Sequence, residues 1–170
     1  HLSLRRQRQM CIRDRATHYE QILENVRSKL LLMGQLSIDS LRLSLQALID
    51  KDAELAGKVR SKDKEIDMLE NELVNDVNVC LSTHAPVAGD LRLLVTTMKI
   101  SHEIERVGDE AKSIARRSKK ILLNDFHVIP KMAEAAQDML REALSVFVEY
   151  DEEKAKSIWT KDLEIDAMNL

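Results

Sequence analysis

Apolar residues recur at steps of three and four along most of this chain, which is the period of an amphipathic α-helix. A first apolar stripe runs from Tyr19 to about Ile49, and a second runs from Leu55 to about His84. The turn-prone sequence DKD at residues 50–52 separates the two stripes. The pattern therefore predicts two long helices that are joined by a short turn.

A second break in the pattern precedes a third helix. Pro86 disfavours helical geometry at the residue before it, and Gly89 allows a tight bend. Asp90 offers a side-chain cap for a helix that runs from about Leu91 to Leu122. Because both connections are short, consecutive helices should be antiparallel, so that the three helices form an up-down-up bundle.

The helical pattern restarts near Pro130, a residue type that is common in the first turn of a helix. When the chain is compared with itself at an offset of 99 positions, KDLEID at residues 161–166 aligns with KDKEID at residues 62–67. The same offset places Asp151 on Asp52, and apolar positions repeat together with the charged ones. A three-helix unit is therefore predicted to be duplicated. The second copy stops inside its second helix, so part of its core should be exposed.

These patterns predict an all-α fold of tandem three-helix bundles. Residues 16–123 should form the complete first bundle, and residues 124–170 the incomplete second one. Residues 1–15 differ in composition, because they hold five arginines and only one aspartate. The sequence QMCIRDR within them is similar to a translated sequencing-library adaptor, so we expect this segment to be non-native. The alternative is a native basic extension of the first helix.

Composition narrows the classes of function. With only 4 Gly and 2 Pro in 170 residues, the chain has too few turn-forming residues to separate many short strands, which favours long helices. The net charge of -3 and the aromatic content of 3% argue against nucleic acid as a partner. No stretch approaches the roughly 18 to 20 consecutive apolar residues that span a bilayer, so we expect no membrane insertion and a cytoplasmic location.

Two pairs of carboxylates are spaced four residues apart, Asp63 with Asp67 in the second predicted helix and Glu105 with Asp109 in the third. Like charges at this spacing cost roughly 0.2 to 0.5 kcal/mol per pair unless a cation or a basic partner lies between them. Hard oxygen ligands from two adjacent helices suit iron, manganese, magnesium or zinc, and His102 lies nearly one turn before Glu105 as a further ligand. The four carboxylates are therefore the candidate metal ligands.

Ion pairing is the alternative to a metal at these carboxylates. Arg106 could neutralise one of them, and paired or solvated carboxylates are the commoner fate of such residues. The chain lacks GxxxxGK[ST], GxGxxG, GxSxG and HExxH, which are motifs of phosphate-binding loops and of catalytic sites. Di-iron bundles use Glu-x-x-His, whereas His102 here precedes Glu105. These residues favour a protein that is not an enzyme, and a carboxylate-bridged metalloenzyme is the competing class.

Three segments together resemble a known family. They are KDKEIDMLE at residues 62–70, APVAGDLR at residues 85–92 and IERVGDEA at residues 104–111. The chain is similar, from about residue 19 to its last residue, to the PhoU regulators of phosphate transport, and its internal repeat is similar to their tandem pair of three-helix bundles. His84 stands where the family usually has Gln.

The resemblance implies a cytoplasmic regulator, often a homodimer, that is not an enzyme. It implies association with the phosphate ABC transporter and with a phosphate-sensing histidine kinase, and repression of the phosphate-starvation response when phosphate is plentiful. Some family members carry metal clusters on E(D)xxxD motifs, which the two carboxylate pairs resemble. A PhoU-like module of another phosphate carrier is a further alternative, because it would differ only in its partner.

Overall fold

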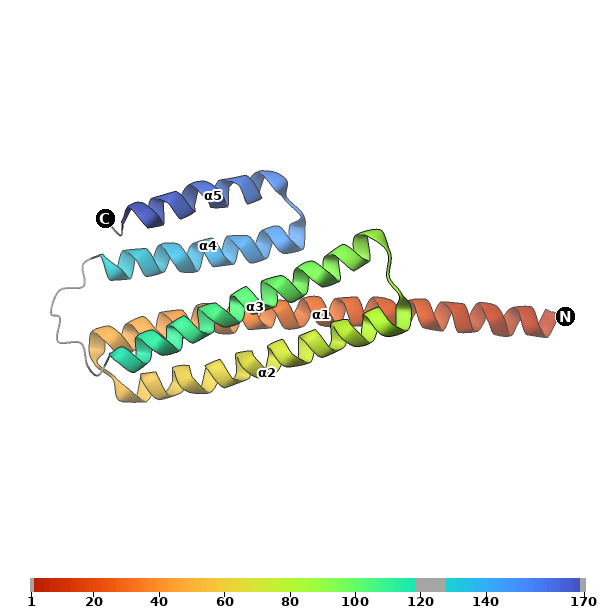
Figure 1. Ribbon diagram of the computed structural model, residues 1–170, viewed down its shortest axis with the longest axis horizontal. Coiled ribbons are helices and arrows are strands. Elements are labelled where there is room, and N and C mark those ends of the chain that lie inside the picture. The colour runs from red at the N-terminus through yellow and green to blue at the C-terminus, as the bar shows by residue number, and fades with distance from the viewer. Residues whose placement is uncertain (1, 119–127, 169–170) are drawn as a thin grey trace.

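The computed structural model describes the backbone of residues 2–118 and 128–168, and side chains from residue 18 onward within those ranges. It contains five helices in this part of the chain and no strand there, so the prediction of an all-α fold is confirmed (Figure 1). The helices are α1 (Leu2–Asp50), α2 (Ala53–His84), α3 (Ala88–Arg117), α4 (Ile129–Glu149) and α5 (Glu152–Ala167). The predicted end of the third helix at Leu122 lies outside the described residues.

The first three helices form the predicted up-down-up bundle. α1 packs against both α2 and α3, and α2 and α3 also pack against each other. Their shared core consists of fully or almost fully buried apolar side chains, namely Val26, Leu30, Met33, Ile66, Leu73, Val77, Leu94 and Ile104. Because these residues follow the three- and four-residue steps of the sequence, the apolar stripes correspond to the buried faces.

The helix α1 begins at Leu2, well before the predicted start near Tyr19. Its first part extends past the ends of α2 and α3 (Figure 1). The backbone of residues 2–15 therefore continues the helix beyond the bundle. That this segment is non-native stays a prediction.

Two of the turns are built alike, which supports the internal repeat. Lys51 and Tyr150 both adopt a left-handed conformation, with φ of 54° and 57°. The next residue in each case caps the following helix, because Asp52 accepts hydrogen bonds from the first backbone amides of α2 and Asp151 does so for α5. These are the positions that the offset of 99 residues aligns.

Replacing Asp52 with alanine is expected to lower the free energy of unfolding by about 1 kcal/mol, because two amides of α2 lose their acceptor. Asp52→Asn keeps a capping oxygen and is the matched control. Urea unfolding followed by circular dichroism measures both variants. An Asn variant as unstable as the Ala variant would show that the aspartate acts through something other than capping.

The turn between α2 and α3 differs from the prediction. Ala85 and Ala88 take the left-handed conformation there, with φ of 46° and 48°, whereas Gly89 has no positive φ and lies in α3. The N-cap of α3 is Val87, which makes no side-chain cap, so the prediction that Asp90 caps this helix is wrong. Pro86 disfavours the right-handed helical conformation at Ala85, so α2 ends at His84, as predicted.

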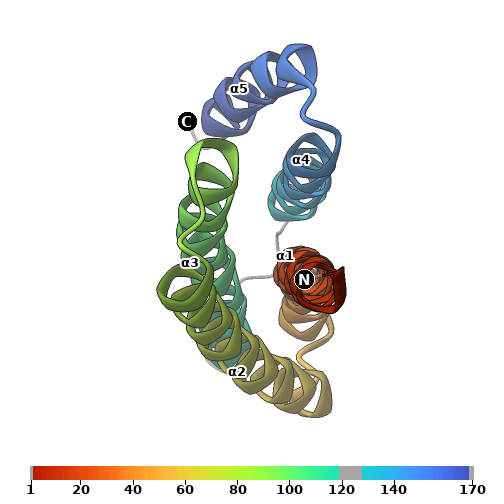
Figure 2. The same cartoon turned by 90° about the vertical axis from the view of Figure 1, so that its right-hand side faces the viewer.

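The remaining two helices form the incomplete second bundle. α4 packs on α1 and on α5, whereas α5 packs only on α4 among the described helices (Figure 2). No residue of α5 is buried, and its Trp159 and Leu163 are exposed, as expected for an incomplete bundle. The contact of α4 with α1 is close at Gly34, where a Cβ atom would lie 2.4 Å from Cδ1 of Leu144. No helix in the described part of the chain combines the length and apolar character that crossing a membrane requires.

Candidate metal centre

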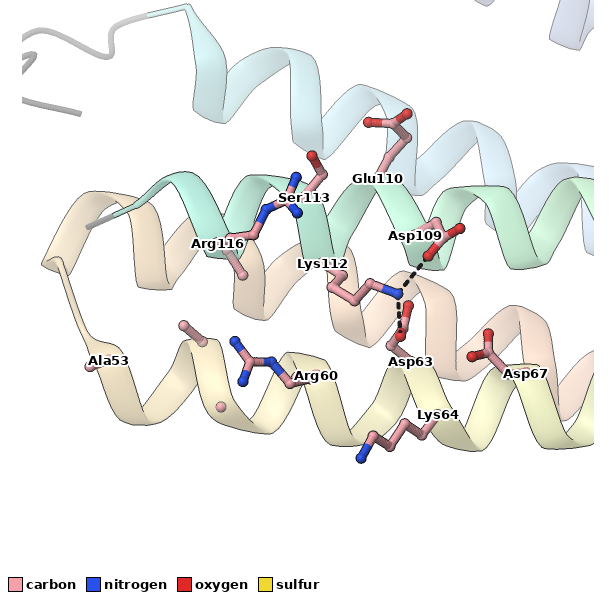
Figure 3. A pocket seen from close by; sticks show the side chains of 13 residues that line it. Ala53, Arg60, Asp63, Lys64, Asp67, Asp109, Glu110, Lys112, Ser113 and Arg116 are labelled. Carbon is pink, nitrogen blue, oxygen red and sulfur yellow. Dashed lines mark hydrogen bonds and ion pairs between the residues drawn. The ribbon is translucent and has the colours of Figure 1, made fainter. Parts of the chain in front are cut away.

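Acidic residues from two helices meet in a groove between α2 and α3. Asp63, Asp67 and Glu70 share one side of α2, because they are spaced by four and three residues. Glu105 and Asp109 face them from α3. One lobe of this groove has a volume of about 880 Å³ and is lined by Asp63, Asp67 and Asp109 among others (Figure 3).

The two helices approach each other closely beside these carboxylates. Gly108 precedes Asp109, and a Cβ atom at this position would lie 3.0 Å from Cδ1 of Ile66 on α2. A larger residue at this position would require the Ile66 side chain to move. Asp63 is only 3% exposed, although it is charged, because it occupies a position of the apolar stripe of α2.

Lys112 neutralises one end of the acidic group. Its Nζ donates hydrogen bonds of 2.7 Å to Oδ2 of Asp63 and of 2.7 Å to Oδ1 of Asp109 (Figure 3). These bonds, first that to Asp109 and then that to Asp63, raise the pKa of Lys112 above its usual range. The hydrogen bond from Lys112 likewise holds the pKa of Asp109 below its usual range. Charge-assisted bonds thus join α2 to α3.

The basic partner is not the one expected from the sequence. Arg106 pairs with Glu103 on the exposed face of α3, with 2.7 Å between Nη1 and Oε2, and not with any of the four candidate carboxylates. The sequence did contain a signal for Lys112, because it lies three residues after Asp109 and so shares its face of the helix.

A second group lies at the other end. Single donor atoms of Glu70, His102 and Glu105 lie within 4.8 Å of one another. Nδ1 of His102 is 3.3 Å from Oε1 of Glu70 and 3.9 Å from Oε2 of Glu105. The structure thus brings His102 to Glu105, as expected. Glu70 was missed, although it lies three residues after Asp67 on the same side of α2.

Asp67 and Glu105 carry negative charge that no lysine or arginine pairs with in the described part of the chain. Burial, and then the nearby charge of Asp63, raises the pKa of Asp67. Burial, followed by the charges of Asp109 and Glu70, raises the pKa of Glu105, whose side chain is 18% exposed. Both shifts have the direction expected where carboxylates are crowded together without enough positive charge.

The donor set fits a metal ion. Carboxylates with one imidazole, held on two packed helices, suit manganese, iron or zinc, and the carboxylates alone suit magnesium. Of the four predicted ligands, Asp63 and Asp109 are bridged by Lys112, while Asp67 and Glu105 are not. The accessible donors are therefore centred on Glu105, with Glu70 and His102 beside it.

Asp67→Asn is expected to raise the free energy of unfolding of the metal-free protein by about 0.5 kcal/mol at pH 7, since it removes a like-charge pair at four-residue spacing. The pKa of Asp67 is raised on folding, so its ionised form destabilises the folded protein above that pKa. The stability gained by Asp67→Asn should therefore shrink as the pH falls and the Asp67 carboxyl of the unsubstituted protein becomes neutral. Urea unfolding in a chelator at several pH values measures this.

Asp76→Asn is the matched control, because Asp76 on the same helix accepts a hydrogen bond of 2.8 Å from Lys29. It should not be stabilising at pH 7. If Asp67→Asn lowers the stability at pH 7 as well, Asp67 is compensated by a partner and its charge is not in excess.

Comparison with known proteins shows similarity along most of the chain. The model of the PhoU domain family matches residues 30–118 and 129–170. The phosphate-specific transport system accessory protein PhoU homolog of Zymomonas mobilis is 35% identical over 154 residues, which are 88% of this chain and 65% of that protein. The homolog of Pseudomonas aeruginosa is 32% identical over 167 residues, which are 92% of this chain and 69% of that protein.

Solved structures agree with the sequence comparisons. The crystal structure of PhoU from Pseudomonas aeruginosa superposes with a TM-score of 0.83 at 32% identity, covering 88% of this chain and 74% of that one. That of the phosphate transport system regulatory protein PhoU from Streptococcus pneumoniae gives 0.80 at 27% identity, covering 88% and 72%. The chain spans about two thirds of the length of the curated relatives it matches.

Proposed function

Because this chain belongs to the PhoU family, we propose that it regulates phosphate uptake and phosphate-starvation signalling. It is a regulatory accessory protein and not an enzyme, which sets aside the carboxylate-bridged metalloenzyme. The observation that carries the proposal is the combination of 35% identity over 154 residues with a shared fold.

The chain acts, in this proposal, as a cytoplasmic docking protein. It joins the phosphate ABC transporter to a phosphate-sensing histidine kinase, as a homodimer, and represses the starvation response when phosphate is plentiful. Its charged helical faces support a docking role, because complementary charge gives partner choice without a catalytic pocket. The name shared by the relatives, accessory protein of phosphate-specific transport, supports the choice of the transporter as a partner.

A metal ion in the α2–α3 groove is part of the proposal. Glu70, His102 and Glu105 are its ligands, and Asp67, Asp63 and Asp109 offer ligands for a further ion along the groove. Iron, zinc, manganese and magnesium are the candidates. When bound, the ion would supply positive charge to an acidic surface and so change which partner surface the groove attracts.

Complementation tests the regulatory role. The 170-residue chain is expressed in a bacterium that lacks its own PhoU homologue and carries a reporter induced by phosphate starvation. We expect repression of the reporter in phosphate-rich medium. Cross-linking and co-purification from the same cells should recover the phosphate ABC transporter and the kinase. A folded, abundant chain that neither represses the reporter nor binds either protein would contradict the proposal, and recovery of another phosphate carrier would favour the module alternative.

A further inference from the structure

Lys112 occupies the position between two carboxylates that belong to facing helices. Its ammonium lies 2.7 Å from an oxygen of Asp63 on α2 and 2.7 Å from an oxygen of Asp109 on α3 (Figure 3). We propose that the Lys112 ammonium is an internal competitor for the metal, so that an ion bound between Asp63 and Asp109 must first displace it. This inference rests on the metal site proposed above.

The arrangement divides the groove into two parts. At the Glu70, His102 and Glu105 end, no lysine or arginine pairs with a carboxylate within the described residues. At the other end, Lys112 satisfies both Asp63 and Asp109. A cation that binds at the first end therefore displaces no lysine or arginine of the described chain. Only at the far end does it encounter a protein cation that already holds the carboxylates.

The lysine side chain has room to leave this position. Its side chain is 40% exposed, and the four-carbon stem lets the ammonium swing into the adjoining lobe of the groove, where it would be hydrated. Asp63 cannot follow, because its side chain is buried. A divalent ion that replaces Lys112 would bring two positive charges to carboxylates that now share one. Exchange is thus possible in both directions, and the lysine restores its two ion pairs when the metal leaves.

Manganese(II) titration of three forms of the full chain tests the competition. Lys112→Met removes the ammonium and keeps a long side chain. The control is Lys64→Met, which also removes one positive charge next to Asp63 in sequence. The Lys64 side chain points away from Lys112 (Figure 3). We expect Lys112→Met to bind Mn²⁺ between Asp63 and Asp109 at least ten times more tightly than the unsubstituted chain does. Lys64→Met should bind it within about threefold, because it changes the net charge equally but vacates no position between the carboxylates.

A labelling experiment needs no substitution, and so it stays decisive if Lys112→Met fails to fold. Lysines of the unsubstituted chain are acetylated with an amine-reactive ester, with and without saturating Mn²⁺, and the rate at each site is read by mass spectrometry. Labelling of Lys112 should become several times faster with Mn²⁺. Labelling of Lys58, which pairs with Glu54 at 2.9 Å outside the groove, should not change.

The outcomes separate this inference from the metal site itself. If the unsubstituted chain binds Mn²⁺ but Lys112→Met binds it no more tightly than Lys64→Met, and Lys112 labelling is unchanged by the metal, the competition is overturned and the metal site stands. If no form binds Mn²⁺, the metal site and the competition both fail. If only Lys112→Met binds Mn²⁺, the result supports the competition, because the Lys112 ammonium then prevents metal binding in the unsubstituted chain.

Discussion

Glu105→Ala is expected to lower the affinity of the protein for Mn²⁺ or Zn²⁺ by at least about 10-fold. Glu105 is the residue that links the two parts of the groove, because it lies beside His102 and Glu70 at one end and feels the charge of Asp109 at the other. Losing a partner that only orients a metal ligand costs about 10- to 100-fold, and losing a ligand should cost no less. Calorimetric titration with elemental analysis measures this effect.

The same helix offers a matched control. Glu103→Ala removes a carboxylate two residues away that is exposed and pairs with Arg106, so metal affinity should stay within about twofold. Glu105→Ala should also leave the metal-free protein folded, because the charged form of Glu105 is disfavoured by burial. Equal metal content in the Glu105→Ala, Glu103→Ala and unsubstituted proteins would show that the groove carboxylates are ordinary surface charges and that the protein docks without a metal.

Gly34→Ile is expected to separate α4 and α5 from the first bundle, at a cost of about 1–3 kcal/mol. A Cβ atom at residue 34 would already meet Cδ1 of Leu144 and lie 2.9 Å from its Cδ2, and the further carbon atoms of isoleucine would enlarge this overlap. Hydrogen exchange should therefore accelerate throughout α4 and α5, while the core amides of α2 and α3 stay protected.

Two further variants test the steric cause. Gly57→Ile lies in α2, where nothing is within 4 Å of the added Cβ atom, so it should not accelerate exchange in α4 or α5. Leu144→Ala combined with Gly34→Ile should restore part of the contact, since it removes the clashing methyl groups. Faster exchange in α2 and α3 of Gly34→Ile would mean that the substitution disturbs the first bundle and not the contact with α4.

Much of the fold followed from local patterns. The apolar period identified the buried faces, and the aligned Asp52 and Asp151 proved to cap equivalent helices because capping depends only on neighbouring residues. The turn after α2 was harder, since Gly89 and Asp90 are residues that usually make such a turn, whereas two alanines hold the left-handed positions here.

The groove was predictable only in part. Helical spacing placed four carboxylates on facing sides of α2 and α3, but it did not determine how far one helix is shifted along the other. That shift decides that Lys112 reaches Asp63 and that Glu70 lies beside His102. It depends on the packing of the whole core, including the close approach at Gly108, and no local pattern encodes it.

The exposed face of α5 carries a natural fluorescent probe, the indole of Trp159. Trp159 is the only tryptophan, and 73% of it is accessible to solvent. Its emission should be that of a hydrated indole and should hardly change when the core of α1 to α3 melts. Whatever comes to cover α5 will shift the emission to shorter wavelength, so docking on this face can be followed optically without a label.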